Sequence, residues 1–394
     1  MTPASTPPIP LGPSAPVVGV IGAGQLARMM QPAAIALGLR LRVLSADPSD
    51  CANQVIPDVV SGHPSDLEAV LGFARGCDVV TFEHEHVPAK VLDALVATGI
   101  PVRPGPGALL YAQDKAEMRA KLSSLGLPCP AWARVATPAD AAEFGNETGW
   151  PIVLKATRGG YDGRGVWVVE DADSAARVVE EAAARGVALL AEAAVPFVRE
   201  LAAQVARSPH GQAVAYPVVE TVQAEGICRE VYAPAPLVDE EHALEAQRIA
   251  LTIAKELEVT GMLAVELFQT ADGRLWINEL AMRPHNSGHW TIDGAVTSQF
   301  ENHLRAVLDL PLGSPAPHAP LAVMANVIGL DLPDLYPAYL HCLARDPGLK
   351  IHNYGKSVKP GRKIGHVTVL GRDFEDSAER ARHAAAYLRG EIDE

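Results

Sequence analysis

The sequence lacks any run of about 18 consecutive apolar residues, so no membrane-spanning helix and no membrane partner are expected. Positive charge is also scarce, because 33 Lys and Arg residues stand against 47 Asp and Glu residues and give a net charge of −14. A molecule with that charge repels polyanions, so DNA and RNA are not expected as partners. Any phosphate must be bound locally, by a few basic side chains and backbone N–H groups, which favours small nucleotides.

Cysteine is rare and scattered. The five cysteines form no C-x-x-C pair, which argues against a disulfide framework or a zinc knuckle and favours reduced thiols in the cytoplasm. Residues 1–16 are rich in proline and have neither a charged n-region nor an apolar h-region. We expect a disordered lead-in there instead of a signal peptide.

The 394 residues exceed one comfortable core, so two or three packed units are expected. An apolar fraction of 48% and a charged fraction of 20% are typical of a soluble globular protein. Strand and helix patterns alternate in residues 17–110, which predicts a Rossmann-like parallel sheet. The predicted elements are strands at 17–22, 41–44 and 78–82 and helices at 25–37 and 66–74.

Patterns farther along the chain are more mixed. A helix over 111–126 is followed by two strands that flank a glycine-rich turn, and then by a helix and a strand. An amphipathic helix, two strands separated by a turn signal, a further helix, a proline-rich linker, two strands and a closing helix complete the chain. The strands are predicted at 151–156, 166–169, 188–191, 262–269, 275–278, 323–328 and 366–370. The helices after the one at 111–126 are predicted at 173–185, 241–257, 299–308 and the C-terminus, and the linker at 311–320.

The first glycine loop runs from Gly22 to Arg28, between a strand and a helix. Free N–H groups and the helix dipole make such a turn an anion site. The third glycine of a dinucleotide fingerprint is Ala27 here, and only Asp47 stands where a ribose-binding acid is expected. The loop therefore has two further interpretations, as an NAD site or as a structural turn.

The second glycine loop, Gly159–Gly165, follows Lys155 at the end of a strand. Its glycines can lie flat over a triphosphate and offer N–H donors, while Lys155 and Arg164 add positive charge. A flexible hairpin tip is the alternative interpretation.

Two acidic residues, Glu266 and Glu279, lie in the strands on either side of the turn at Gly273. If these strands are antiparallel neighbours, the two carboxylates face the same side. Two carboxylates, an amide and nucleotide phosphates suit Mg²⁺, which takes few protein oxygens and keeps water ligands. A structural ion pair is the alternative.

A polar segment from Met282 to Trp290 follows directly and is typical of a substrate loop. His285 and His289 have the spacing of a zinc helix, but Pro284 and Gly288 oppose a helix, so zinc is not expected. Near the C-terminus, basic residues interleave with glycines and predict either a phosphate cradle or a solvated basic face. These basic residues are Lys356, Lys359, Arg362, Lys363 and His366.

Four segments together carry a family resemblance. GAGQLARM (22–29), TRGGYDGRG (157–165), NELAMRPHNSGHWT (278–291) and PGRKIGH (360–366) resemble the 5-(carboxyamino)imidazole ribonucleotide synthetase family of the ATP-grasp superfamily. The resemblance implies an α/β protein that is α+β in its central part. It implies a Rossmann-like domain over 17–110, an ATP-grasp domain over 111–312 with a lid at about 136–196, and a small C-terminal domain over 313–394.

The implied activity is that of an ATP-dependent ligase in purine synthesis. ATP and bicarbonate give carboxyphosphate, and the amine of 5-aminoimidazole ribonucleotide is then carboxylated. ATP and Mg²⁺ are the implied cofactors, and a homodimer is the implied assembly. We expect a mobile lid, because carboxyphosphate must be protected from water.

The resemblance also implies roles for individual residues. It places Glu266 and Glu279 on the metal and assigns catalysis to Lys155, Tyr161, Asp162, Arg164 and Arg283. The implied ATP contacts are Lys115, Lys155, Gly160, Tyr161, Asp162, Gly163, Arg164, Gly165, Val166, Glu192, Ala193, Ala194, Val195, Glu200, Gln223, Asn278 and Glu279. The implied ribonucleotide and bicarbonate contacts are Gly24, Gln25, Leu26, Glu83, Tyr161, Arg164, Arg283, His285, Asn286, Ser287, Lys356, Arg362 and Lys363.

Some positions depart from the family pattern: Lys115 stands where Arg is more frequent, Gln223 where His is common, Thr221 where Asn is frequent, and Met282 where Pro is usual. Three rival functions remain open. They are another ATP-grasp ligase, such as a formate-dependent glycinamide ribonucleotide transformylase or a biotin carboxylase; a nicotinamide oxidoreductase built on the first glycine loop; and an inactive nucleotide-binding regulatory subunit.

Overall fold

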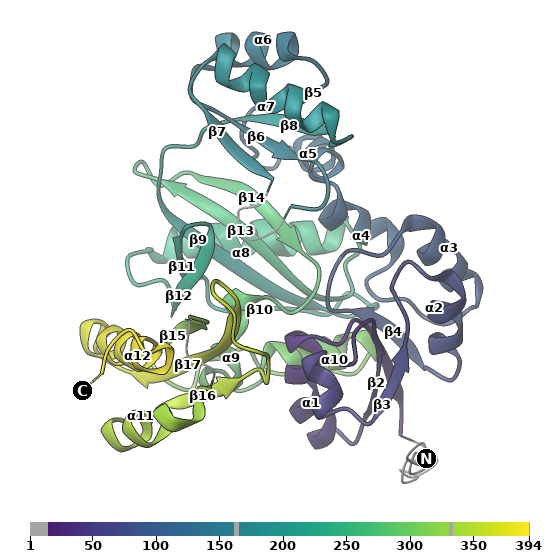
Figure 1. Ribbon diagram of the computed structural model, residues 1–394, viewed down its shortest axis with the longest axis vertical. Coiled ribbons are helices and arrows are strands. Elements are labelled where there is room, and N and C mark those ends of the chain that lie inside the picture. Colours follow the sequence, from purple (N-terminus) through teal and green to yellow (C-terminus); the bar gives the residue numbers. More distant parts are fainter. Residues whose placement is uncertain (1–14, 161–164, 331–333, 394) are drawn as a thin grey trace.

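The computed structural model describes residues 15–160, 165–330 and 334–393, which form three β-sheets with helices packed around them (Figure 1). Most of the expected lead-in, residues 1–14, lies outside the described residues, as do Tyr161, Asp162, Gly163 and Arg164 of the second glycine loop. No helix among the described residues is long and apolar enough to cross a membrane.

The N-terminal sheet is parallel, with the strand order β3-β2-β1-β4, as the alternating pattern predicted. Strand β1, which lies between β2 and β4, is fully buried, as expected for a parallel strand covered on both faces. The strands are β1 (Val17–Ile21), β2 (Arg40–Ser45), β3 (Asp58–Ser61) and β4 (Val79–Phe82). The helices of this part are α1 (Gln25–Ala36), α2 (Leu67–Ala74) and α3 (Ala89–Ala97).

The single helix predicted over 111–126 is wrong. The structure has two helices, α4 (Pro106–Gln113) and α5 (Lys115–Ser124), separated by Asp114 in an extended conformation. Its carboxylate accepts the N–H groups of Ala116 and Glu117 at 3.0 and 3.2 Å, so Asp114 caps a new helix. This break places Lys115 in the first turn of α5.

A second sheet forms the top of Figure 1, and we call residues 132–193 the upper lobe. Its strand order is β5-β8-β6-β7, and α6 and α7 cover one face. Strands β6 and β7 form the expected antiparallel hairpin, with Lys155 opposite Val166 and the second glycine loop between them. The elements are β5 (Trp132–Val135), α6 (Pro138–Thr148), β6 (Ile152–Ala156), β7 (Val166–Val169), α7 (Ala172–Ala184) and β8 (Leu189–Ala193).

The third sheet has the order β14-β13-β9-β11-β12-β15-β17-β16, with β10 paired to β9. Because β12 pairs with β15, the C-terminal strands continue the central sheet instead of forming a separate one. The strands are β9 (Phe197–Arg207), β10 (Ala213–Ala215), β11 (Val219–Ala224), β12 (Ile227–Ala233), β13 (Gly261–Thr270), β14 (Leu275–Ala281), β15 (Leu321–Ile328), β16 (Lys350–Asn353) and β17 (Lys363–Gly371).

The remaining helices pack against this sheet. Helix α8 supplies buried residues to the core that β9 and β13 share. His303 of α10 joins two parts of the fold, because its Nδ1 accepts the Met262 N–H at 3.1 Å and its Nε2 lies 2.9 Å from Thr81 Oγ1. These helices are α8 (Glu240–Glu256), α9 (Thr291–Gly294), α10 (Gln299–Val307), α11 (Tyr339–Arg345) and α12 (Phe374–Arg389).

Candidate active site

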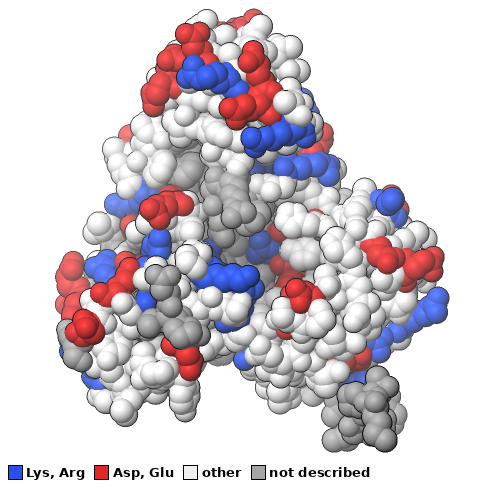
Figure 2. All heavy atoms as spheres, in the orientation of Figure 1, with Lys and Arg blue, Asp and Glu red and all other residues white. Residues whose placement is uncertain are grey.

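The three parts of the molecule surround one cavity of about 1590 Å³. The space-filling view shows the surface hollowed beneath the upper lobe (Figure 2). The described residues to which the family resemblance gave a role all line this cavity, except Gly165. His366, which the sequence analysis placed in the basic phosphate cradle, does not line it; this histidine is completely buried beside Tyr354. The assignments of Tyr161, Asp162, Gly163 and Arg164 fall outside the described residues.

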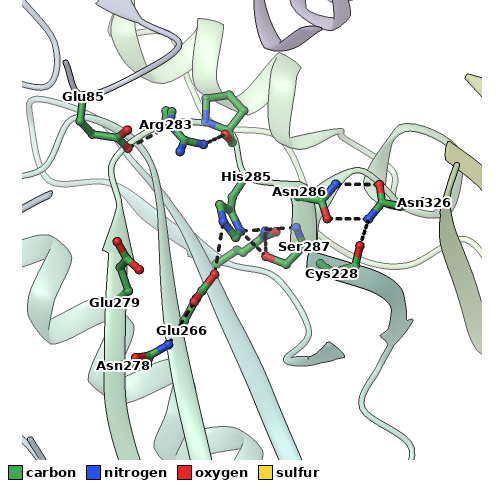
Figure 3. A network of polar contacts seen from close by, with 12 residues as sticks. Glu85, Cys228, Glu266, Asn278, Glu279, Arg283, His285, Asn286, Ser287 and Asn326 are labelled. Carbon is green, nitrogen blue, oxygen red and sulfur yellow. Dashed lines mark hydrogen bonds and ion pairs between the residues drawn. The ribbon is translucent and has the colours of Figure 1, made fainter. Parts of the chain in front are cut away.

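The acid pair, Glu266 and Glu279, lies at the floor of the cavity on β13 and β14. The antiparallel pairing expected for these strands is confirmed, and the two acids are register partners. Burial, followed by the charges of Glu279 and Glu200, raises the pKa of Glu266 to about 7. Asn278 Nδ2 lies 3.4 Å from Glu266 Oε2 (Figure 3). Burial therefore makes the charged form of Glu266 unfavourable in the protein alone.

Lys155 is the penultimate residue of β6, above the acid pair, and is almost completely buried. Its Nζ lies 2.8 Å from Glu192 Oε2 and 3.0 Å from Asn278 Oδ1. Burial lowers the pKa of this ammonium group, because the charged form loses its hydration. Lys155 thus ties the upper lobe to the strand that carries Glu279.

Arg119 of α5 is a site residue that the sequence analysis missed. It is completely buried, its Nε lies 2.6 Å from Glu192 Oε1, and its Nη2 donates to the Asn278 carbonyl at 2.8 Å. Burial alone would raise the pKa of Glu192, but the charges of Lys155 and Arg119 outweigh burial and lower it to about 2. In the sequence Arg119 resembles any helical surface cation, so no local signal marks it.

Lys115 and Glu200 complete this side of the cavity. Lys115 contacts the carboxylate of Glu279 directly, so one acid of the pair has a cationic partner from α5. Glu200 lies on β9 opposite Thr221 of β11, and burial raises its pKa to about 6. Gln223 of β11 also lines the cavity, together with residues 193–195 at the end of β8.

The predicted substrate loop follows β14 and is not α-helical; it forms a 3₁₀ turn over Asn286–Gly288. His285 Nε2 lies 3.4 Å from Glu266 Oε1, and burial lowers the pKa of this histidine to about 3. Asn286 exchanges two hydrogen bonds with Asn326 of β15, at 3.0 and 2.8 Å (Figure 3). The loop is therefore fixed between the acid pair and the C-terminal strands.

Arg283 projects from the same loop toward the N-terminal part. Its Nε lies 2.9 Å from Glu85 Oε1, an ion pair without hydrogen-bond geometry (Figure 3). Glu85 and Asn326 were not predicted as site residues. Both contact the loop from segments far away in the sequence, so only the folded chain reveals them.

The N–H groups of the first glycine loop are bound by a side chain of the same chain. Glu83, at the end of β4, accepts the Ala27 N–H at 3.1 Å and also contacts the Gly24 N–H. Gly22 has φ +110°, and a Cβ atom there would lie 2.4 Å from Glu83 Cγ. Because Glu83 occupies these donors, the dinucleotide interpretation loses its pyrophosphate site.

The basic loop, residues 356–363, faces the first glycine loop across the cavity. Lys356 contacts the Gln25 side chain, and Lys359, Arg362 and Lys363 line the same wall. Burial lowers the pKa of Lys356, and the charges of Arg362 and Lys363 add to this effect. Cations gathered on a concave wall fit an anionic ligand better than the alternative of a solvated face.

A paired-acid sheet beneath a lobe with a glycine-rich hairpin defines an ATP-grasp enzyme, and residues 120–300 match the family model of the ATP-grasp domain. Residues 16–113 match the ribonucleotide synthetase preATP-grasp domain, and residues 322–380 match the phosphoribosylaminoimidazole carboxylase C-terminal domain. The chain belongs to the N5-carboxyaminoimidazole ribonucleotide synthase family.

Individual relatives support this assignment over almost the whole chain. The N5-carboxyaminoimidazole ribonucleotide synthase of Mycobacterium tuberculosis is 52% identical, over 95% of this chain and 88% of its own. The crystal structure of the Thermus thermophilus synthetase has a TM-score of 0.85 at 39% identity, covering 95% of this chain and 99% of that one. A structure from Aspergillus clavatus, in complex with ADP and 5-aminoimidazole ribonucleotide, has a TM-score of 0.87 at 34% identity, covering 96% and 99%.

Proposed function

We propose that this protein carries out the reaction of its family. It carboxylates the amine of 5-aminoimidazole ribonucleotide with bicarbonate and couples this step to the conversion of ATP to ADP and phosphate. The product is N5-carboxyaminoimidazole ribonucleotide, an intermediate of purine biosynthesis. One observation carries the proposal: the acid pair, two lysines and the basic loop line a single cavity in a chain of this family.

Mg²⁺ fits the acid pair. Among the described residues no group of three or more His, Cys, Asp or Glu side chains could hold a metal ion. Glu266 and Glu279 are nevertheless two hard oxygen donors in register, and burial and mutual repulsion raise the pKa of Glu266. Mg²⁺ typically takes one or two carboxylates and completes its shell with water and phosphate. When bound, the ion would neutralise charge on the nucleotide phosphates.

ATP is proposed to lie between the upper lobe and the central sheet. Lys115 and Lys155 supply positive charge beside the acid pair, and the second glycine loop, Gly159–Gly165, with Val166 after it, would cover the phosphates. Glu200 and Gln223 border the adenosine end. The remaining proposed contacts are Glu192, Ala193, Ala194, Val195, Asn278 and Glu279, with Tyr161, Asp162, Gly163, Arg164 and Gly165 in the covering loop.

The ribonucleotide is proposed to lie between the first glycine loop, the substrate loop and the basic loop. The cations of the basic loop suit its phosphate, and Glu83 suits the hydroxyl groups of its ribose. His285 and Arg283 face the reacting end, next to Glu266. The proposed contacts are Gly24, Gln25, Leu26, Glu83, Arg283, His285, Asn286, Ser287, Lys356, Arg362 and Lys363, with Tyr161 and Arg164 from the covering loop.

Lys155 and Arg283 are proposed to act in the reaction itself, with Tyr161, Asp162 and Arg164. Lys155 lies where charge develops on the transferred phosphoryl group, and the low pKa of Glu192 keeps that carboxylate charged beside it. Arg283 supplies a planar set of donors for bicarbonate or carboxyphosphate.

We also propose the domain division 17–110, 111–312 and 313–394, with the lid at about 136–196, a homodimeric assembly and a cytoplasmic location. Large apolar side chains exposed on the surface, such as Leu340 and Tyr336, are compatible with subunit contacts. The five free cysteines are compatible with a reducing compartment. Sedimentation equilibrium tests the assembly, and a monomer at micromolar concentration would contradict it.

The function is tested by measuring ADP release with ATP, Mg²⁺, bicarbonate and 5-aminoimidazole ribonucleotide. We expect turnover that requires all four components. The comparison reaction replaces the last two with formate and glycinamide ribonucleotide. Turnover only in the comparison reaction would overturn the proposal.

A further inference from the structure

Two buried glutamines converge on His285 of the substrate loop. Gln299, the first residue of α10, is completely buried. Its Oε1 accepts the His285 N–H at 2.9 Å, and its Nε2 donates to the His285 carbonyl at 2.8 Å. Both backbone groups of His285 are therefore bound by one side chain from a different element.

The second glutamine, Gln204 of β9, reaches the ring of His285 through Ser287. Its Nε2 donates to Ser287 Oγ at 2.9 Å, and Ser287 Oγ lies 2.8 Å from His285 Nδ1. Since the hydroxyl oxygen already accepts from Gln204, its hydrogen is available for Nδ1.

A backbone contact favours the same arrangement of protons on the ring. The Ser287 N–H donates to His285 Nδ1 at 3.4 Å, and a backbone N–H cannot accept. Both contacts favour an unprotonated Nδ1 and a neutral ring that carries its hydrogen on Nε2. That nitrogen faces Glu266 Oε1 at 3.4 Å and the cavity (Figure 3).

Gly288 explains how both glutamines come so close. A Cβ atom on this residue would lie 2.5 Å from the Oε1 atoms of Gln204 and Gln299. Only glycine lets the backbone pass between the two amides. Gln204 and Gln299 are themselves buried behind the loop, while His285 and Ser287 line the cavity.

We propose that Gln204 and Gln299 are positioning residues, which hold His285 in one orientation and one tautomer with an Nε2–H donor facing the ribonucleotide. This inference rests on the proposed function. A donor that is already aimed requires no reorganisation when the substrate reacts.

The tautomer is measured directly on the wild-type protein. In histidine labelled with ¹⁵N, long-range proton–nitrogen correlation spectra distinguish a protonated from an unprotonated ring nitrogen. The signals of His285 are assigned by their loss in His285→Asn. We expect protonated Nε2 and unprotonated Nδ1. Protonated Nδ1 would overturn the proposal, because Ser287 would then donate to Gln204 Oε1 instead.

The kinetic test uses Gln204→Met, which keeps the volume and removes the donor. We expect kcat to fall roughly 10- to 100-fold, while the KM for ATP changes less than about twofold. The matched control is Gln269→Met, a buried glutamine of β13 bonded to the Gly273 carbonyl, which should leave both constants within about twofold. An unchanged kcat in Gln204→Met would contradict the proposal.

A double variant separates positioning from general damage. Because Gln204 acts through Ser287, adding Gln204→Met to Ser287→Ala should cost less than about a further twofold in kcat. Full additivity of the two losses in kcat would contradict the proposal that Gln204 acts on His285 through Ser287. If the wild-type enzyme shows no ligase turnover, the proposed function fails, and the spectrum of His285 still decides the tautomer.

Discussion

Glu266 of β13 and Glu279 of β14 are register partners, so the two acidic residues lie directly opposite each other on neighbouring antiparallel strands. Burial and this neighbour raise the pKa of Glu266 to about 7. Such an arrangement is unfavourable in the protein alone and becomes favourable when a divalent cation lies between the acids.

Glu279→Gln is therefore expected to lower magnesium-dependent ADP release at least about 100-fold, because one of the two proposed metal ligands is lost. The free energy of unfolding without metal should change by less than about 1 kcal/mol, since the side chain of Glu279 is 42% exposed. Glu245→Gln, on the exposed face of α8, is the control for the substitution itself. Full turnover of Glu279→Gln at ordinary magnesium concentrations would remove Glu279 from the metal site.

Arg283→Ala is expected to raise the KM for the ribonucleotide at least about tenfold and the KM for ATP much less, because the arginine lies beside His285 and away from the upper lobe. Arg283→Lys should recover only part of this loss, since it keeps the charge but not the planar set of donors. Steady-state kinetics with each substrate varied in turn provide the measurement. Equal increases in both KM values would argue for general distortion of the loop.

Glu192→Gln is expected to lower the free energy of unfolding by about 3 to 5 kcal/mol, because it leaves Arg119 and Lys155 buried without a carboxylate. The control is Glu117→Gln, which removes a solvent-exposed ion pair with Arg134 and should cost less than about 1 kcal/mol. Urea unfolding at pH 7 measures both variants.

The same ion pairs have a pH signature. The pKa of Glu192 falls from 4.5 to about 2 in the folded state, so its stabilisation is complete above pH 4.5 and is lost as the pH falls toward 2. The stability gap between wild type and Glu192→Gln should therefore narrow over that range. A stability difference that stayed constant down to pH 2 would show that the ion pairs of Glu192 are not its cause.

His303 gives a second pH dependence at a higher pH. Burial lowers its pKa from 6.5 to about 3, so the unfolded chain takes up a proton in this range and the folded chain does not. Stability should fall as the pH drops from 6.5 toward 3, by up to about 1.4 kcal/mol per pH unit for this group.

His303→Gln should be less stable than wild type by about 1 to 3 kcal/mol at pH 8, because the Gln amide does not place an acceptor at the position of Nδ1 beside the Met262 N–H, and the difference should shrink by pH 4. The exposed His318→Gln serves as the control. Thermal unfolding over this pH range gives the comparison, and parallel curves for His303→Gln and wild type would contradict the assignment.

Gly22→Ala combines backbone strain with a clash against Glu83 and should cost more than about 2 kcal/mol. Gly38→Ala, at φ +68° with open space around it, isolates the strain and should cost about 1 kcal/mol. Because Gly22 touches Glu83, only its variant should also raise the KM for the ribonucleotide. Equal effects of the two variants would exclude a special role for the turn.

The sequence predicted the N-terminal parallel sheet because its strands are short apolar runs between helical patterns. It left 197–233 unassigned, where the structure has β9 to β12. Strand β9 is rich in alanine and lies between β13 and β11, so its conformation depends on neighbours that local propensity does not reveal.

The residues of the candidate site were likewise predictable where they are close in the sequence and not where they are far apart. Glu266 and Glu279 are close in the sequence, so a single turn was enough to predict their pairing. Arg119 and its partner Glu192 are 73 residues apart, and nothing local connects them. The helical pattern places Asp114 inside a helix, because its capping role depends on where the helix begins, and that boundary is weakly encoded.

The continuous strand pairing from β14 to β16 limits how the enzyme can admit its substrates. The acid pair and the strands beside the basic loop belong to one hydrogen-bonded sheet, so widening the gap between them would break backbone pairing. The upper lobe belongs to a separate sheet. We therefore expect access to the cavity to be controlled by rotation of the upper lobe over a floor that keeps its shape throughout turnover.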